Sequence, residues 1–359
     1  MRQSILFDPD LIRRFDVPGP RYTSYPTADR FHDQSDAVDL VGRLGECART
    51  GASLSLYFHL PFCNTVCYYC ACNKLVTKDR SVVEPYLAAL EQEMLLVSTH
   101  FGDVPSVSQI HWGGGTPTFL QSGEISRLMQ AIRSRFRLEE GGEYSIEIDP
   151  RQISTETVVQ LAHEGFNRMS IGIQDFSLEV QRAVNRIQSI EETAFVMDAA
   201  RANGFRSISV DLIYGLPRQD KESFEKTLDI VLSLRPDRLS LYNYAHLPTR
   251  FMPQRRIAEA DLPLPEEKLE ILAMAIEKLL AAGYVFIGMD HFARPDDELA
   301  IAQARGSLQR NFQGYSTHAE CDMLGFGVSS IGKIRGLFVQ NQRELDGYYR
   351  ALGEGRIPV

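Results

Sequence analysis

The sequence predicts an α/β protein whose parallel sheet curves into a partial (β/α)6 barrel. Between Leu54 and Tyr244, six apolar strand-like runs alternate with stretches in which apolar residues recur every three or four positions, as expected for parallel strands joined by helices. The carboxyl ends of these predicted strands also carry cysteine, glycine or polar residues. A barrel gathers such ends around one mouth, whereas an open doubly wound sheet brings only its middle strands to a ligand.

The elements can be placed in order along the chain. We expect strands at residues 54–60, 107–112, 144–148, 168–173, 208–214 and 239–244, and helices around residues 82–100, 125–136, 155–163, 190–202 and 224–232. Further on, the pattern predicts a helix at 267–282, a strand at 284–289 and a loop-rich tail at 310–332. We therefore expect an N-terminal extension that packs on the barrel mouth (1–52), a barrel core (53–250) and barrel-completing elements (251–359).

Composition narrows the class of protein. Among 359 residues, 44% are hydrophobic and 24% are charged, which is ordinary for a folded globular chain. No apolar run is long enough to span a membrane, and the N-terminus lacks the pattern of a signal peptide. The net charge of −9 disfavours a nucleic-acid partner, because phosphate binding draws on clustered Lys and Arg. The sequence therefore predicts a cytoplasmic protein without membrane or nucleic-acid partners.

Three cysteines follow the first predicted strand with the spacing C-x3-C-x2-C: Cys63, Cys67 and Cys70. Three thiolates on one short loop can wrap an iron–sulfur core of the four-iron type, which takes four ligands. One iron would then keep an open position for a small molecule. A zinc site that also uses Cys72 is an alternative, although zinc cysteines usually come as separated C-x2-C pairs. The isolated Cys47 is interpreted as a structural thiol, as is Cys321.

Other candidate residues follow later strands. Three consecutive glycines, from Gly113 to Gly115, would let the backbone approach a ligand closely, although such runs often mark only a tight turn. Glu147 and Asp211 are carboxylates at the ends of apolar strands, where each must either cap backbone amides or hold a polar ligand. Arg186 would make a charge-assisted pair with a carboxylate if it points inward.

The cysteine spacing, with the aromatic Tyr69 before the third cysteine, resembles the radical S-adenosylmethionine enzymes. In that superfamily the open iron binds the amino and carboxylate groups of S-adenosylmethionine. One electron from the cluster then breaks a C–S bond and yields a 5′-deoxyadenosyl radical. The resemblance therefore implies that the cofactors carry the difficult chemistry and that the protein aims it.

Further motifs make the resemblance closer, and they extend over nearly the whole chain. They are RYTSYPTA (21–28), SLYFHLPFC (55–63), HWGGGTPT (111–118), EIDPR (147–151), GIQDF (172–176), VNR (184–186), DLIYGLP (211–217), YNYAHLPT (242–249), GMDHFARP (288–295) and NFQGY (311–315). Together they resemble the family of oxygen-independent coproporphyrinogen III oxidases. Members of that family commonly have phenylalanine before the third cysteine. This chain has Tyr69 at that position, a change that keeps an aromatic ring.

This resemblance implies specific roles for residues of this chain. Cys63, Cys67 and Cys70 would hold one [4Fe–4S] cluster. Two molecules of S-adenosylmethionine would bind, the first at the cluster in contact with Tyr57, Gly114 and Glu147. The second would contact Tyr69, Gly115, Thr116, Gln174, Arg186, Asp211, Ala245 and Ile331. Arg21 is a candidate contact for a substrate propionate, on the basis of its charge.

The resemblance also implies an activity. It is the oxidative decarboxylation of two propionates of coproporphyrinogen III to vinyl groups, giving protoporphyrinogen IX for heme synthesis without oxygen. The implied enzyme is a monomer that needs an electron donor and an electron acceptor, neither of which the sequence identifies. Members of the family continue into a C-terminal helical domain that would begin near Val359. We therefore expect this chain to form the barrel and hold the cluster but to turn over substrate poorly.

Two related functions are alternatives. The heme-binding chaperones of the family share the cysteine strand, but they carry an aromatic residue at the position of Cys72 and lack the RYTSYPT segment. Another porphyrin-acting radical S-adenosylmethionine enzyme, such as a heme-degrading methyltransferase, is the second alternative. Both Cys72 and the RYTSYPT segment favour the decarboxylating oxidase.

Overall fold

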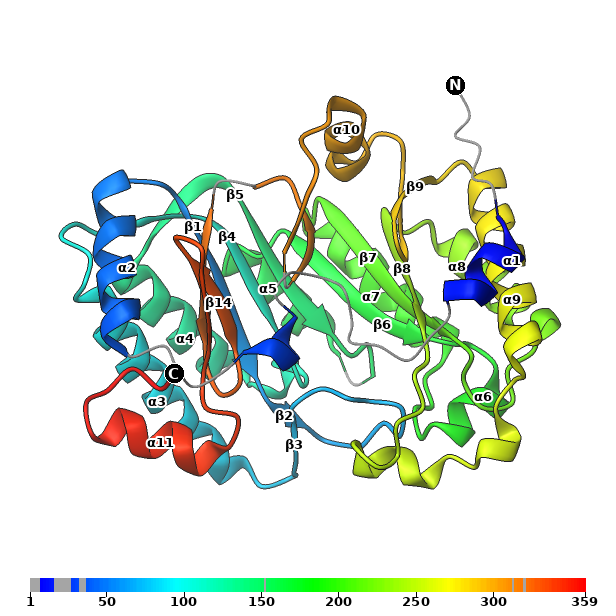
Figure 1. Ribbon diagram of the computed structural model, residues 1–359, viewed down its shortest axis with the longest axis horizontal. Helices are drawn as coiled ribbons and strands as arrows, with labels where there is room; N and C mark the ends of the chain where they lie inside the picture. Colours follow the sequence, from blue (N-terminus) through cyan, green and yellow to red (C-terminus); the bar gives the residue numbers. More distant parts are fainter. Residues whose placement is uncertain (1–6, 16–26, 32–36, 152, 312, 319–320) are drawn as a thin grey trace.

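A computed structural model of the chain describes residues 7–15, 27–31, 37–151, 153–311, 313–318 and 321–359 (Figure 1). Its centre is an eleven-stranded sheet with the order β15-β14-β13-β1-β4-β5-β6-β7-β8-β10-β9. From β13 to β8, neighbouring strands are parallel, and the outer strands at both edges run antiparallel to their neighbours. Among the helices so described, none is both long and apolar enough to cross a bilayer.

The strands of the main sheet are β1 (Leu54–Leu60), β4 (Ser106–Gly114), β5 (Arg137–Ile148), β6 (Arg168–Gln174), β7 (Ser207–Tyr214), β8 (Arg238–Asn243), β9 (Val285–Gly288), β10 (His291–Ala293), β13 (Asp322–Phe326), β14 (Ile331–Ile334) and β15 (Leu337–Gln340). Two small pairs lie outside it: β2 (Phe62–Cys63) with β3 (Leu75–Val76), and β11 (Gln309–Asn311) with β12 (Gly314–Ser316).

The α-helices are α1 (Pro9–Phe15), α2 (Ala37–Thr50), α3 (Val83–Ser98), α4 (Ser122–Arg135), α5 (Thr155–His163), α6 (Leu178–Ala183), α7 (Ile190–Ala202), α8 (Lys221–Leu234), α9 (Pro265–Ala281), α10 (Glu298–Arg305) and α11 (Leu345–Gly353). Short 3-10 helices are η1 (Ala28–Arg30), η2 (Arg80–Val82), η3 (Pro117–Phe119), η4 (Met252–Arg256) and η5 (Glu259–Asp261). Local sequence explains several boundaries. At α7, for example, Ser189 and Glu192 form a reciprocal capping box.

The two faces of the parallel sheet differ in chemistry. Successive side chains of a strand point to opposite faces, and in β5 the apolar Ile146 and Ile148 are buried while Ser145 and Glu147 belong to the other face. The apolar face packs against the helices that connect the strands (Figure 1). The other face carries polar side chains and lines a cavity. Ordinary (β/α)8 barrels fill this interior with branched apolar residues, so a polar interior indicates a binding site.

The predicted fold class, a partial (β/α)6 parallel barrel with additional C-terminal elements, is confirmed. The strands predicted between residues 54 and 244 are β1, β4, β5, β6, β7 and β8. Their ends shift by at most two residues, except that β5 begins at Arg137 and not at residue 144. The prediction of a loop-rich tail at 310–332 was wrong, because that segment contains β11, β12 and β13 and begins β14. Strand β13 has only five residues, one of them Gly325, and it depends on pairing with β1, to which it runs parallel.

Candidate active site

The cysteine loop leaves the barrel at the carboxyl end of β1. Pro61 ends that strand, and β2 and β3 then pair in parallel, which closes the base of the loop between residues 63 and 76. Two further hydrogen bonds support this base, from Leu75 N to Pro61 O (2.7 Å) and from Thr77 N to Cys63 O (2.9 Å). The chain therefore presents Cys63, Cys67 and Cys70 from one short loop whose two ends are joined.

The sulfur atoms of this loop face donors and cations. Thr116 donates its hydroxyl to Cys63 Sγ (3.6 Å), and Cys67 Sγ receives contacts from Arg186 Nη1 (3.6 Å) and Arg151 Nη2 (3.8 Å). A hydrogen bond from Cys72 lowers the pKa of Cys70 to about 6, with Lys74 adding to the effect. Positive charge and hydrogen-bond donors stabilise thiolates. These contacts suit Cys70 as an anionic ligand, whereas burial raises the pKa of Cys63 to about 11.

This environment fits an iron–sulfur cluster. All six cysteines of the chain are free. Among the described residues, no three side chains of His, Cys, Asp or Glu converge closely enough to hold a single metal ion. A four-iron core binds its thiolates at separate corners, so its ligands need not converge on one point. The buried Nε of Arg186 also has no hydrogen-bond partner among the described residues, although its guanidinium contacts Cys67.

The glycine run after β4 lies directly against this loop. Gly115 N donates to Leu60 O (2.8 Å), and Thr116 N donates to Phe62 O (2.7 Å). Gly114 has a φ of +111°, and a Cβ at this position would lie 2.6 Å from the ring of His59. A Cβ on Gly115 would lie 2.7 Å from Pro61 O. The glycines are therefore required by close packing of the site itself.

Glu147 is held at the end of β5 by two groups from β4. His111 Nε2 lies 3.1 Å from its Oε1, and Gly114 N donates to its Oε2 (3.2 Å). Burial acts to raise the pKa of Glu147, but His111 and Gly114 outweigh it and the pKa is lowered. The Glu147 side chain nevertheless remains 43% exposed. It is thus an ionised carboxylate, already oriented, with capacity for a further donor.

Tyr57 and His59, both on β1, lie close to His111, the partner of Glu147. The Tyr57 hydroxyl lies 3.1 Å from His59 Nδ1, and its ring stacks on His111 with centroids 5.8 Å apart. The other ring nitrogen of His59 lies 2.9 Å from Asn73 O, on the cysteine loop. Tyr57, predicted as a site residue, therefore lies against His59 and against His111, the partner of Glu147. His59 was not predicted.

A second group of charges lies beside Cys67. Asp149 accepts from Arg151 Nη2 (2.5 Å) and Arg186 Nη1 (3.2 Å), and Arg186 Nη2 donates to Gly172 O (2.6 Å). Burial raises the pKa of Asp149, but the two arginines reverse this effect and the pKa is lowered. Arg186 is only 7% exposed. The sequence indicated that Arg186 would face a carboxylate, and the structure identifies the partner as Asp149, which was not singled out.

Strands β6 and β7 contribute Gln174 and Asp211. Gln174 adopts a left-handed φ of +68° at the end of its strand. Ser170 Oγ donates to Asp211 Oδ2 (3.1 Å). Burial raises the pKa of Asp211 to about 6, and the charge of Glu147 adds to the effect. Asp211 and Glu147 thus face a common space.

The remaining predicted contact residues are Tyr69, Ala245 and Ile331. Gln254, which is 1% exposed, donates through Nε2 to Tyr69 O (3.0 Å) and to Ala245 O (3.2 Å), and so joins two predicted site residues. Nothing in the single sequence indicated Gln254. Ile331 belongs to β14, and its backbone packs on Gly325, which stands beside Tyr57 in the register of β13 with β1. Arg21 lies outside the described residues.

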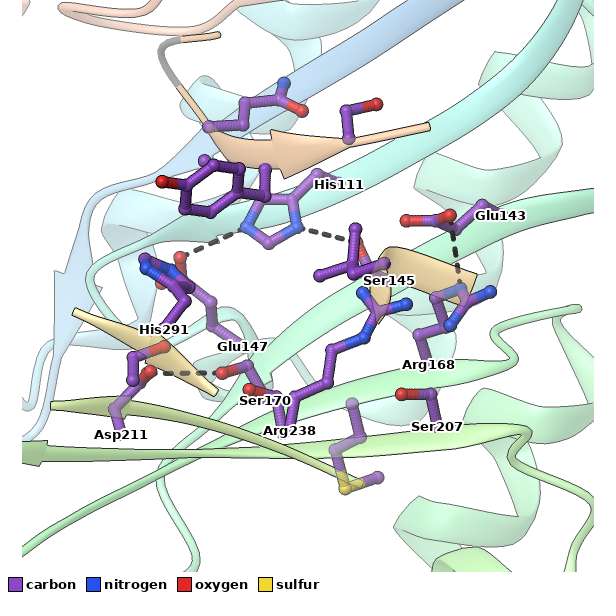
Figure 2. A pocket seen from close by; sticks show the side chains of 18 of the residues that line it. His111, Glu143, Ser145, Glu147, Arg168, Ser170, Ser207, Asp211, Arg238 and His291 are labelled. Carbon is purple, nitrogen blue, oxygen red and sulfur yellow. Dashed lines mark hydrogen bonds and ion pairs between the residues drawn. The ribbon is translucent and has the colours of Figure 1, made fainter. Parts of the chain in front are cut away.

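The polar face of the sheet lines the cavity that Figure 2 shows. At one end, His111 bridges Ser145 and Glu147, and Asp211 lies beside Ser170 (Figure 2). At the other end the charges are paired with one another, since Arg168 contacts Glu143 and Arg238 binds Asp297. Glu147, Asp211 and His111 therefore lie together at one end of the cavity, and the paired charges lie at the other.

Comparison with known proteins agrees with this arrangement. The family model of the radical SAM superfamily matches residues 57–231. The chain is 53% identical to the oxygen-independent coproporphyrinogen III oxidase of Pseudomonas aeruginosa over 361 aligned residues, which cover all of this chain and 78% of the relative. This chain belongs to the oxygen-independent coproporphyrinogen III oxidase family. The predicted cofactors, a [4Fe–4S] cluster and S-adenosylmethionine, are those of this radical SAM family.

Other members of the coproporphyrinogen III oxidase family are similar over the same extent. The protein of that name from Escherichia coli is 51% identical and is aligned with 98% of this chain, over 76% of its own length. The protein from Synechocystis is 44% identical, with coverage of 99% and 76%. A solved structure of coproporphyrinogen III oxidase from Escherichia coli, described as a radical SAM enzyme, superimposes with a TM-score of 0.93 and 50% identity over 99% of this chain and 80% of that chain.

Proposed function

We propose that this chain catalyses the S-adenosylmethionine-dependent oxidative decarboxylation of coproporphyrinogen III propionates to vinyl groups, giving protoporphyrinogen IX. The observation that carries the proposal is the position of the cysteine loop over the polar end of the cavity. Thr116, Arg186 and Gly172 connect the loop to the ends of β4 and β6 through direct contacts. The relatives at 51–53% identity are oxygen-independent coproporphyrinogen III oxidases, which supports the same reaction.

The roles of the residues follow from their contacts. Cys63, Cys67 and Cys70 would hold the cluster, which with S-adenosylmethionine supplies a carbon-centred radical able to remove a hydrogen atom from the substrate. Glu147 would accept from the ammonium group of the cofactor beside Gly114, because it is ionised and already oriented. Arg186 would keep positive charge next to Cys67.

A second S-adenosylmethionine would be bounded by Tyr69, Gly115, Thr116, Gln174, Arg186, Asp211, Ala245 and Ile331. The buried hydrogen bonds of Gln254 hold Tyr69 and Ala245 at a fixed separation. Pyrrole N–H groups of the substrate are donors, and Asp211 offers an acceptor deep in the cavity. The polar lining thus suits a tetrapyrrole that carries both donors and carboxylates.

We extend the proposal to the setting of the reaction. The absence of long basic runs and the net charge of −9 support an enzyme that acts without nucleic acid. A cytoplasmic location is part of the same proposal. A monomer is proposed, with a separate electron donor and electron acceptor. The division into an extension (1–52), a barrel core (53–250) and completing elements (251–359) belongs to the same proposal.

The test is an anaerobic incubation of the reconstituted protein with coproporphyrinogen III, S-adenosylmethionine and dithionite. Protoporphyrinogen IX, carbon dioxide and 5′-deoxyadenosine are expected in the wild-type reaction and are expected to be absent with Cys63→Ser. Stoichiometric hemin binding without any of these products would favour the chaperone instead. S-adenosylmethionine consumption with a methylated or ring-opened porphyrin would favour another porphyrin-acting enzyme.

A further inference from the structure

A cationic loop covers the outer side of the cysteine loop. Residues 247–258, here called the arginine loop, have the sequence LPTRFMPQRRIA and contain three arginines but no aspartate or glutamate. Arg250, Arg255 and Arg256 are all exposed. In a chain with a net charge of −9, this segment is a local exception.

The arginine loop is packed directly on the cysteine loop. Arg256 lies over the ring of Tyr68, with its Cζ 5.2 Å from the ring centroid. Gln254 Nε2 donates to Tyr69 O, and Ile257 is buried in a small apolar cluster with Tyr68 and Tyr69. Tyr68 follows Cys67, and Tyr69 precedes Cys70. Arg256 is therefore only one side chain away from the cysteine ligands, and Arg250 and Arg255 belong to the same loop.

Exposed apolar side chains lie in the same segment. Met252 is 70% exposed, and Leu247 is 44% exposed. The arginines do not line the cavity that would hold the substrate. The arginine loop thus combines a small apolar centre with surrounding positive charges, as transient protein interfaces do. Complementary charge on a partner raises the rate of association.

We propose that the arginine loop is the docking surface for an acidic one-electron carrier protein, which delivers the electron that the cluster requires. This inference rests on the proposed function, because only a cluster that is reduced during turnover needs such a donor. In the transfer step the carrier loses one electron and the cluster gains one, with no bond made or broken. Electron transfer slows steeply with distance, and a carrier bound here would have a short path to the cluster, through Tyr68 or Tyr69.

The test uses the reconstituted wild-type protein, the double variant Arg250→Glu/Arg255→Glu and a control with the same change in charge, Arg305→Glu/Arg135→Glu. Arg305 and Arg135 are exposed, and they end α10 and α4. Helix α10 lies at the opposite edge of the molecule from β2 and β3 in Figure 1. The probe is an acidic flavodoxin, whose affinity is measured by calorimetry and whose rate of cluster reduction is followed by visible absorption.

At low ionic strength we expect the arginine-loop variant to bind the flavodoxin at least tenfold more weakly and to be reduced correspondingly more slowly, whereas the control behaves as wild type. The difference should shrink as salt screens the charges. Dithionite, a small reductant, should reduce all three proteins equally. Equal weakening in the control, or unchanged binding in the arginine-loop variant, would overturn the proposal.

Two further measurements separate this proposal from the proposed function. If the arginine-loop variant lost affinity for coproporphyrin while binding flavodoxin normally, the arginines would serve the substrate and the docking proposal would be wrong. Product formation driven by dithionite tests the decarboxylation itself. Failure of that reaction in wild type would refute the function without altering the flavodoxin affinities, which are measured independently.

Discussion

Two carboxylates near β1 have opposite surroundings. Glu147 lies at the cavity side of the sheet, 43% exposed in its side chain, and pairs with the ionisable His111. Glu93 lies in α3 on the helix side and is 1% exposed. Its partners are three neutral donors, Gly327 N (2.8 Å), Asn341 Nδ2 (2.6 Å) and Tyr348 OH (2.7 Å).

This difference in partners appears in the pKa values. Burial raises the pKa of Glu93 to about 7, because neutral donors only partly offset the loss of water. The pKa of Glu147 is lowered although burial acts against it. Glu93, a buried carboxylate whose hydrogen-bond partners are neutral, therefore has a structural role. A carboxylate that is kept charged and partly open is prepared for a ligand.

Glu93 and its hydrogen-bond partners nevertheless support the site from the helix side of the sheet. Its donor Gly327 begins the turn after β13, and Val328 N donates to Tyr86 OH (3.1 Å). Tyr86 OH in turn donates to His59 O (2.6 Å), at the end of β1. The packing is tight, since a Cβ on Gly327 would lie 2.6 Å from that same carbonyl. Glu93 thus helps to fix the position of β1, the strand that carries Tyr57 and His59.

The largest expected effect is at the cysteine loop. Cys63→Ser should abolish the visible absorption of the reconstituted cluster, because a ligand sulfur is removed. Cys47→Ser should leave that absorption intact, since Cys47 is buried in α2 and burial, followed by Asp322, raises its pKa to about 12. Loss of absorption in both variants would contradict the ligand assignment.

Next in size is the effect of Glu147→Gln on cofactor binding. The neutral amide keeps the shape but removes the charge facing the ammonium group, so the affinity for S-adenosylmethionine, measured by equilibrium dialysis without turnover, should fall at least tenfold. The free energy of unfolding should change little, because the side chain is partly exposed. A strongly destabilised variant with normal cofactor affinity would show that Glu147, like Glu93, has a structural role and does not bind the cofactor.

Glu93→Ala should show the reverse pattern. It leaves three buried donors without an acceptor, and the free energy of unfolding should fall by about 3 kcal/mol. Urea denaturation measures this change. Retention of wild-type stability would show that water or another acceptor can replace the carboxylate.

Glu93 also predicts a pH dependence. Its folded pKa of about 7 lies above its ordinary value of 4.5, so the folded state binds more protons between these values. Its contribution to stability is therefore greatest below pH 4.5 and falls as pH rises toward 7, by about 3 kcal/mol at most. The difference in unfolding free energy between wild type and Glu93→Gln, followed across this range, should show this slope. A pH-independent difference would contradict the assignment.

The smallest effect is expected for Tyr348→Phe. It removes one of the three donors to Glu93 and costs about 1 kcal/mol of unfolding free energy. It should also raise the pKa of Glu93 further, because one hydrogen bond that stabilises the charged form is lost. Tyr349→Phe, a neighbouring change that removes no bond to Glu93, is the matched control; equal losses in both would argue against a specific role.

Local patterns made much of the fold and part of the site predictable. The strand and helix periods identified β1 and β4 to β8, and the cysteine spacing identified the loop, because these signals lie within a few residues of each other. Strand β13 was missed because five residues that include a glycine carry little signal without their partner strand. Gln254 was missed because its role arises only when Tyr69 and Ala245, far apart in sequence, meet in space.

The pairing of β1 with β13 has a consequence for biosynthesis. Leu54 stands beside Asp322 in this ladder, so the strand that leads into the cysteine loop lacks one neighbour until residues 322–326 have left the ribosome. Contacts of such long sequence separation form late, since a large loop must close first. A nascent chain halted before residue 322 would therefore offer its thiols to an iron donor on an unfinished scaffold, and cluster insertion is best timed after synthesis.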